Sequence, residues 1–332
     1  MKQAFEENDA GYQYIIDQKG SEAYQIHNSV FEKKIKKIVN SDSCKSAIKD
    51  WSKFFRVGHF RFVVNPTLPE KSKPLQEKNT ASNNINSSFV QSSTYVRDYD
   101  STTVYFRIQT FDSYHTKEID SVIHANRSKI LSKKNLIIDI RGNGGGTDQS
   151  FWNILPIIYT NPIKNVSVEY LSTPHNNKIW EERQQQSGLS ESEKARYTDY
   201  LKILNAYPGK FVKLFGDSYT TTFDVKYPFP QNVGIIINGD NGSTAEQFLL
   251  AAKQSKKVKL FGATTMGELD ISNMYSITSP DKKYTLWYCI SKSLRIPDNT
   301  IDNKGIAPDY YIDKSIPTEN WLSYVAEIMK DW

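Results

Sequence analysis

Ser243 is the residue whose type and setting could do chemistry most directly, in the stretch INGDNGSTAEQFLLAAKQSKK at 237–257. Glu246 follows three places later and an apolar run at helical spacing comes next, a pattern typical of a capping box at a helix start. The hydroxyl could instead be a nucleophile, because a serine between a buried strand and a helix lies where α/β proteins place their sites. A nucleophilic serine also needs a base, an orienting acid and donors for an oxyanion.

A glycine-rich turn is the second feature with possible chemistry, in NLIIDIRGNGGGT at 135–147. Gly144, Gly145 and Gly146 follow an apolar run, and such a turn can present bare backbone N–H groups to an anion. The segment lacks the Lys-Ser/Thr pair of a phosphate loop and the spacing of a dinucleotide fingerprint, which disfavours nucleotide binding. It predicts either a tight turn or a platform for a substrate backbone or an oxyanion.

The elements that must position these residues alternate between two kinds of pattern. Strands are predicted at VYFRI, NLIIDI, NVSVEYL, VGIIIN and VKLFG, and helices near 116–132, near 148–160 and from Thr244. This alternation is typical of an α/β layered core with mainly parallel strands. Continuous apolar runs such as NLIIDI predict central strands that are covered on both faces.

The rest of the chain divides by composition. Apolar residues at spacings of three and four predict an N-terminal helical domain over 1–62. Residues 63–96 are rich in Pro, Lys, Asn and Ser and predict a connector or loop. The α/β core is expected over 97–315, with a polar, helix-prone insertion near 176–212 that could cover one edge as a lid. A capped amphipathic helix is predicted over 316–332.

Composition excludes several classes of function. The 332 residues are 38% hydrophobic and 13% aromatic, which favours a folded chain, and the net charge of +5 is scattered, which disfavours nucleic-acid binding. With Cys44 and Cys289 alone, the chain cannot build a disulfide framework or a cysteine metal site. No apolar run approaches the roughly 18 residues of a membrane span. The opening MKQAFEENDAGYQY lacks a secretory signal, which predicts a cytoplasmic protein or a mature chain whose leader was removed.

Four motifs in order carry a resemblance to a known family: LIIDIRGNGGG, IIINGDNGSTAEQFLLAA, VKLFGATTMGE and IDNKGIAPDYYI. Together they resemble the C-terminal processing (tail-specific) peptidase family and its relative, the tricorn protease core, over about 105–312. The resemblance implies a crotonase-like (ClpP/crotonase) layered core. Many members of the processing branch carry a PDZ domain before this core. Here only 64–93 is available, about 30 residues, so no PDZ domain is expected.

In the processing branch a serine–lysine dyad does the chemistry. The resemblance places the nucleophile on Ser243 and the position of the lysine on Glu268, in TTMGELD, so the dyad lysine is absent. An ionised glutamate has too low an unperturbed pKa to take a proton from a serine hydroxyl without other help.

In the tricorn-like branch a histidine from the N-terminal part and a late acid replace the lysine. The resemblance puts the histidine on His59, in FRVGHFRF, and the acid on Asp302, in TIDNKGIAPD, with Glu268 as the alternative acid. A Ser-His-Asp arrangement is chemically coherent, because imidazole takes the hydroxyl proton and the acid fixes its tautomer. Without catalysis, His59 would be a hydrogen-bonded histidine between a helix and a strand, and Asp302 a turn former.

The resemblance also assigns the oxyanion site, to the glycine turn and the residue after the nucleophile. In this chain these are Gly145, Gly146 and the backbone N–H of Thr244. The strand-end Arg141 is expected to be structural.

The leading hypothesis is a serine endopeptidase that forms an acyl-enzyme on extended peptide or protein substrates, with no metal or cofactor. The resemblance implies that the peptide adds to a strand edge, and that the protein acts in the cell envelope, periplasmic or extracellular. One alternative is a non-catalytic protein on the same fold, either a degenerate peptidase that holds peptides or a carrier like the retinoid-binding module of the interphotoreceptor matrix. Another is acyl-CoA chemistry of the crotonase type. The oligomeric state is left open.

Overall fold

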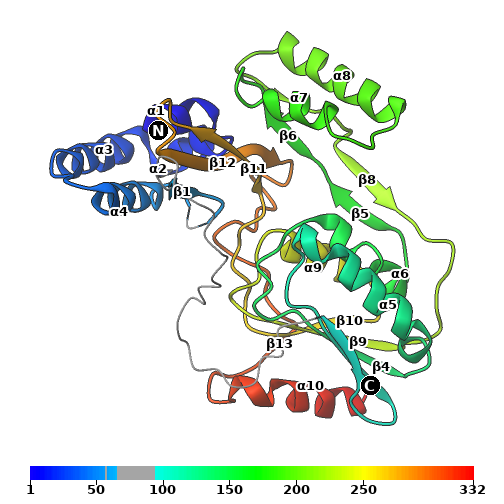
Figure 1. Ribbon diagram of the computed structural model, residues 1–332. Coiled ribbons are helices and arrows are strands. Elements are labelled where there is room, and N and C mark those ends of the chain that lie inside the picture. The colour runs from blue at the N-terminus through cyan, green and yellow to red at the C-terminus, as the bar shows by residue number, and fades with distance from the viewer. Residues whose placement is uncertain (57, 66–93) are drawn as a thin grey trace, which may run out of the picture.

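The computed structural model describes residues 1–56, 58–65 and 94–332 (Figure 1). The connector predicted over 63–96 falls mostly on residues 66–93, which lie outside the described residues. Within the described ranges, no helix is both long enough and apolar enough to cross a membrane.

A six-stranded sheet is the largest sheet among the described residues. Its order is β13-β10-β9-β4-β3-β2, with the bounds Tyr310–Tyr311, Val258–Gly262, Asn232–Ile237, Asn135–Asp139, Thr103–Arg107 and Tyr95–Asp98. All neighbours are parallel except β2, which is antiparallel to β3. Every residue of β3 and β4 is buried, as continuous apolar runs predict. The α/β class predicted from the sequence is confirmed.

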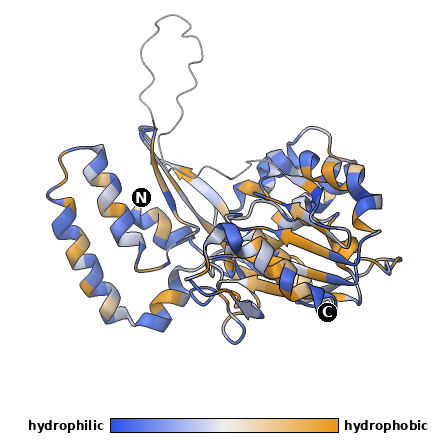
Figure 2. Ribbon diagram, turned by 90° about the horizontal axis from the view of Figure 1, so that it is seen from below, coloured by the Kyte–Doolittle hydropathy of each residue, from blue (hydrophilic) through white to orange (hydrophobic). Residues whose placement is uncertain are grey.

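Helices cover both faces of this sheet (Figure 1). One face packs against α5 (Thr116–Ile130), α6 (Leu155–Ile158) and α9 (Thr244–Ala252), and the other against α10 (Trp321–Lys330). Figure 2 shows hydrophobic residues concentrated on the strands between these layers. The helix predicted near 148–160 is instead the 3-10 turn η2 (Asp148–Phe151) followed by the short α6, which has a proline in its first turn.

A second sheet is antiparallel and packs against the N-terminal helices. Strand β12 (Tyr284–Ser293) pairs with β1 (Arg61–Val64), β6 (Val168–Leu171) and β11 (Ile271–Thr278), and β6 pairs with β7 (Phe211–Val212). The four N-terminal helices are α1 (Lys2–Asn8), α2 (Tyr12–Lys19), α3 (Ser21–Ile35) and α4 (Ser41–Ser52). They share one apolar cluster with these strands. The stretch predicted as a single α/β core over 97–315 thus contributes strands to both of these sheets.

The predicted insertion near 176–212 contains two helices, α7 (Lys178–Gln184) and α8 (Glu191–Ala206). They pack against each other, away from the six-stranded sheet (Figure 1). The two-stranded sheet of β5 (Ile163–Val166) and β8 (Ser218–Thr221) lies between them and the six-stranded sheet (Figure 1).

Candidate active site

Ser243 lies between the end of β9 and the start of α9, with backbone angles φ 53° and ψ −125°. A positive φ is uncommon for a residue other than glycine, and such strain gathers at functional sites. The hydroxyl makes no capping hydrogen bond to the helix. Glu246, the other half of the expected capping box, is fully buried and accepts hydrogen bonds from Thr265, Gly267 and Glu268 instead. The capping box is therefore not formed, and the partly exposed Ser243 hydroxyl is left without this structural role.

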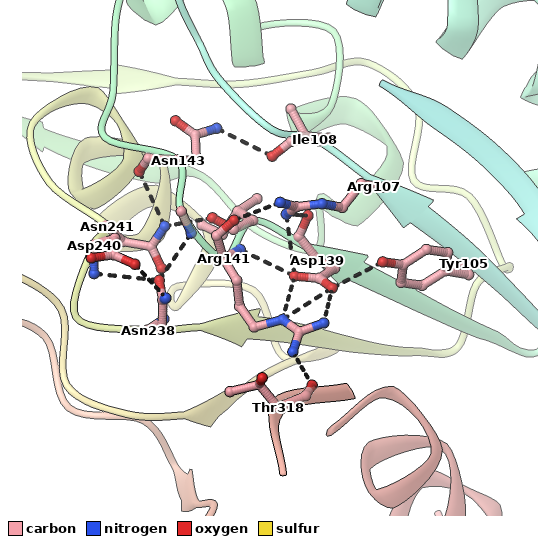
Figure 3. Close-up of polar contacts among 12 residues, drawn as sticks. Tyr105, Arg107, Ile108, Asp139, Arg141, Asn143, Asn238, Asp240, Asn241 and Thr318 are labelled. Atoms are coloured by element: carbon pink, nitrogen blue, oxygen red, sulfur yellow. Dashed lines mark hydrogen bonds and ion pairs between the residues drawn. The ribbon is translucent and has the colours of Figure 1, made fainter. Parts of the chain in front are cut away.

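Two asparagines tie the Ser243 loop to the glycine turn (Figure 3). The fully buried Asn241 amide donates to the carbonyls of Ile140 at 2.5 Å and Asn143 at 3.1 Å. The Asn241 side-chain oxygen accepts from the backbone N–H of Asn238 at 2.8 Å. The Asn238 side-chain oxygen in turn accepts from the backbone N–H of Gly142 in the glycine turn at 3.0 Å. Neither residue was predicted from the sequence, although both are polar residues directly after a buried strand, a pattern that could have indicated them.

Gly145 brings the glycine turn against the nucleophile. Its φ is 105°, and a Cβ at this position would lie 2.8 Å from the Ser243 Cβ and 2.9 Å from the Thr244 nitrogen. No side chain fits there. The Gly145 N–H itself already donates to the Asn143 side chain at 3.0 Å. Within the described residues, the N–H groups of Gly146 and Thr244 have no acceptor, so these two remain available to an oxyanion.

A buried charge network supports the glycine turn from behind (Figure 3). The fully buried Asp139 carboxylate pairs with Arg141 at 2.6 Å and Arg107 at 3.3 Å, and accepts from the Tyr105 hydroxyl at 2.9 Å. Burial alone would raise the pKa of Asp139, but the contacts with the two arginines outweigh it and hold the pKa below its usual value. Arg141 also donates to the Thr318 carbonyl, so its contacts are structural.

His59 lies between α4 and β1, also with a positive φ, of 49°. The ring Nδ1 is 2.7 Å from the carbonyl oxygen of Ile271. Because a carbonyl oxygen only accepts, Nδ1 carries the proton, and Nε2 is left with a lone pair as a general base requires. The side chain is about one-tenth exposed. Within the described residues, the ring makes no hydrogen bond with the Ser243 hydroxyl.

Glu268 lies between the two candidate catalytic side chains. Its carbonyl oxygen accepts from the Ser243 N–H at 2.9 Å, and its carboxylate is 3.8 Å from His59 Nε2. The carboxylate packs directly on Gly58, where an added Cβ would lie 1.8 Å from the Glu268 Cδ. Glu268 therefore contacts the Ser243 backbone through its carbonyl and faces the His59 ring through its carboxylate.

Asp302 is turned to the backbone rather than to the histidine. Its carboxylate accepts from the N–H groups of Leu269 at 2.7 Å, Asp270 at 2.6 Å and Ile271 at 3.0 Å. Burial raises its pKa. The direct hydrogen bond to His59 expected from the sequence is absent among the described residues. The Asp302 carboxylate instead accepts from the N–H of Ile271, and the carbonyl of Ile271 accepts from the His59 ring.

Comparisons with known proteins identify a family and a shared fold. Residues 102–312 match the model of peptidase family S41. No curated protein matches the chain. A protein of Parabacteroides merdae shares the fold with a TM-score of 0.55 at 13% identity, over 98% of this chain and 92% of that one. A lipoprotein from Streptococcus agalactiae shares the fold with a TM-score of 0.51 at 14% identity, over 99% of this chain and 93% of that one.

A third solved structure is mature CPAF complexed with lactacystin. Its TM-score is 0.50 at 15% identity, over 68% of this chain. The present chain spans only 50% of the length of that protein. At these identities the likeness to all three structures extends to the fold alone.

Proposed function

Because this chain belongs to peptidase family S41, a family of serine-type peptidases, we propose that it is an endopeptidase in which Ser243 and His59 cleave peptide bonds. The observation that carries the proposal is Glu268, whose carbonyl holds the strained Ser243 backbone while its carboxylate faces His59 Nε2. A serine with a positive φ and no capping bond has no evident structural role at this helix start.

The proposed reaction follows the acyl-enzyme route. His59 Nε2 takes the hydroxyl proton as Ser243 Oγ attacks the scissile carbonyl, and the oxygen of that carbonyl becomes negative. The N–H groups of Thr244 and Gly146, with the positive end of the α9 dipole, stabilise this oxyanion. His59 then gives the proton to the leaving amine, and water hydrolyses the acyl-enzyme by the same steps. Catalytic hydrogen bonds often tighten only when substrate is bound, so the hydroxyl and the ring would meet in the complex.

The role that the acid plays in a Ser-His-Asp triad is shared here among the Ile271 carbonyl, Glu268 and Asp302. The Ile271 carbonyl fixes the tautomer of His59 at Nδ1, a task that a carboxylate performs in a Ser-His-Asp triad. Glu268 stabilises the imidazolium that forms during the reaction, because its carboxylate lies 3.8 Å from Nε2. Asp302 acts on His59 indirectly, because it fixes the Ile271 peptide group.

The proposal also covers the substrate of the protein, the type of its core and its location. The substrate is an extended peptide or protein segment that adds to a strand edge beside Ser243. The layered core is of the crotonase-like kind, and the N-terminal helices form a domain that contributes His59. We place the protein in the cell envelope or outside the cell, a location supported by the family resemblance and by a structural neighbour that is a lipoprotein.

The alternative is a non-catalytic peptide- or ligand-binding protein. One observation favours it: within the described residues, His59 and the Ser243 hydroxyl share no hydrogen bond. A serine-directed fluorophosphonate followed by intact mass and peptide mapping separates the two functions. We expect one adduct, on Ser243, which is lost in His59→Ala. The matched control is His175→Ala, because His175 also bonds a backbone carbonyl through its ring, that of Ser276. An unlabelled wild-type protein would overturn the peptidase proposal.

A further inference from the structure

A buried ion pair joins the N-terminal helices to the residue before the His59 turn. Asp9, between α1 and α2, and Arg56, after α4, have side chains that are 0% and 7% exposed. Arg56 Nη1 donates to Asp9 Oδ1 at 2.8 Å, and Nη2 donates to Asp9 Oδ2. The Asp9 carboxylate also accepts from the backbone N–H groups of Gly11 and of Cys289 in β12.

The same guanidinium reaches the backbone of His59. Arg56 Nη2 donates to the His59 carbonyl at 3.2 Å, and the buried Cys289 thiol lies 3.6 Å from that oxygen. The Cys289 thiol is also 3.4 Å from the Ile271 carbonyl, which holds the His59 ring. Both the ring and the carbonyl of His59 are therefore fixed by one connected set of groups. A residue with a positive φ needs such support, because its conformation is strained.

Stability alone does not account for this ion pair. Replacing a buried ion pair by apolar residues of similar volume is often neutral or stabilising, because the desolvation cost offsets the attraction. Arg56 Nε is also buried without a hydrogen-bond partner among the described residues, which adds to that cost. What the guanidinium offers is a rigid planar fork that can hold Asp9 and the His59 carbonyl at once. The pair is therefore better suited to fixing a geometry than to raising stability.

We propose that Asp9 and Arg56 are positioning residues that hold His59 in its strained conformation, from which Nε2 reaches the Ser243 hydroxyl when substrate is bound. The inference rests on the proposed function, and it makes the N-terminal helices part of the catalytic apparatus. Neither residue touches the substrate. Their effect is on the rate of the chemical step, because a small misplacement of a catalytic group can cost on the order of 100-fold.

The test separates position from stability. In the double variant Asp9→Leu/Arg56→Met, both charges are removed together, so no buried charge is left unpaired. The His59 carbonyl loses its donor, and the N–H groups of Gly11 and Cys289 lose their acceptor. We expect a lower unfolding temperature than that of the wild type, because these two donors are unsatisfied, and phosphonate labelling of Ser243 about 10- to 100-fold slower. Arg56→Lys keeps a charge and a donor, so its labelling rate should lie between those of the wild type and the double variant. The matched control Phe31→Ala removes a buried ring that packs on Trp51 in the same helices and leaves the His59 contacts intact.

The control should lower the unfolding temperature and leave the labelling rate unchanged. Amide hydrogen exchange of residues 58–61 supplies a readout without chemistry, and it should be faster in the double variant only. A folded double variant that labels at the wild-type rate overturns the inference. If the double variant does not fold, Arg56→Lys decides: wild-type labelling and exchange in that protein overturn the inference as well. If the wild-type protein is not labelled at all, the proposed function fails, and exchange at 58–61 still tests the positioning of His59.

Discussion

The backbone N–H of Ser243 donates to the carbonyl oxygen of Glu268 at 2.9 Å. The N–H of Glu268 in turn donates to the buried Glu246 carboxylate at 2.8 Å, one turn into α9. Hydrogen bonds therefore join the Ser243 backbone, the Glu268 backbone and the first turn of α9. Glu268 therefore supports the Ser243 backbone and is also a neighbour of the His59 ring.

The first prediction concerns the Glu268 charge. Glu268→Gln keeps the backbone bond to Ser243 and the side-chain volume, but removes the negative charge 3.8 Å from His59 Nε2. We expect kcat to fall about 10- to 100-fold with KM little changed, because the charge acts on the imidazolium formed in the transition state. Glu169→Gln is the matched control, since the Glu169 side chain is equally exposed, at 17%, and pairs with Lys292. Steady-state kinetics that show the same loss in both variants would contradict the assigned role.

The second prediction separates Asp302 from Glu268. An asparagine at position 302 can accept with one oxygen only, so Asp302→Asn leaves part of the backbone at 269–271 unsatisfied. We expect a loss of about 1 to 3 kcal/mol in the free energy of unfolding, together with reduced activity. Glu268→Gln should reduce activity without this loss of stability. Urea unfolding and kinetics of the two proteins side by side measure both effects, and an Asp302→Asn protein of wild-type stability would show that the three N–H contacts matter little.

The sequence predicted the parts of this site that depend on strand order. Ser243 and the glycine turn follow β9 and β4, which are adjacent parallel strands, so their carboxyl ends must meet. The place of Asp302 was not predictable, because its three donors are backbone groups that no local pattern specifies. Nor was the pairing of Asp9 with Arg56, since 47 residues of mostly helical chain separate them. The second sheet was missed for a similar reason, as β1 and β12 pair across more than half the chain.

The third prediction tests the close approach of the glycine turn. In Gly145→Ala the new methyl group would lie 2.8 Å from the Ser243 Cβ, on a backbone with φ 105°. We expect the glycine turn or Ser243 to shift and phosphonate labelling to slow by about 100-fold. Gly144→Ala is the control one residue away, because its nearest neighbour is a backbone oxygen at 3.9 Å. Labelling rates that are equal in the two variants would mean that the approach of Gly145 has no catalytic consequence.

The fourth prediction concerns the pH dependence of stability at Asp148, the first residue of η2. Although the residue as a whole is exposed, desolvation of its carboxyl group raises the pKa to about 6, and a contact with Thr244 opposes part of this rise. The ordinary value is 3.8, so between about pH 3.8 and 6 the folded protein binds more protons than the unfolded chain. Stability therefore falls as the pH rises through this interval.

The asparagine side chain of Asp148→Asn cannot ionise, so this residue causes no loss of stability as the pH rises. We expect the variant to unfold at a higher temperature than the wild type at pH 7.5, and the difference to shrink as the pH is lowered toward 4, where the wild-type carboxyl is protonated in the folded state. Thermal unfolding of both proteins at pH 4 and pH 7.5 measures it. Asp120→Asn, in α5 and bonded to Asn153, controls for the loss of a carboxylate elsewhere in the fold. A stabilisation by Asp148→Asn that is the same at both pH values would rule out ionisation as its cause.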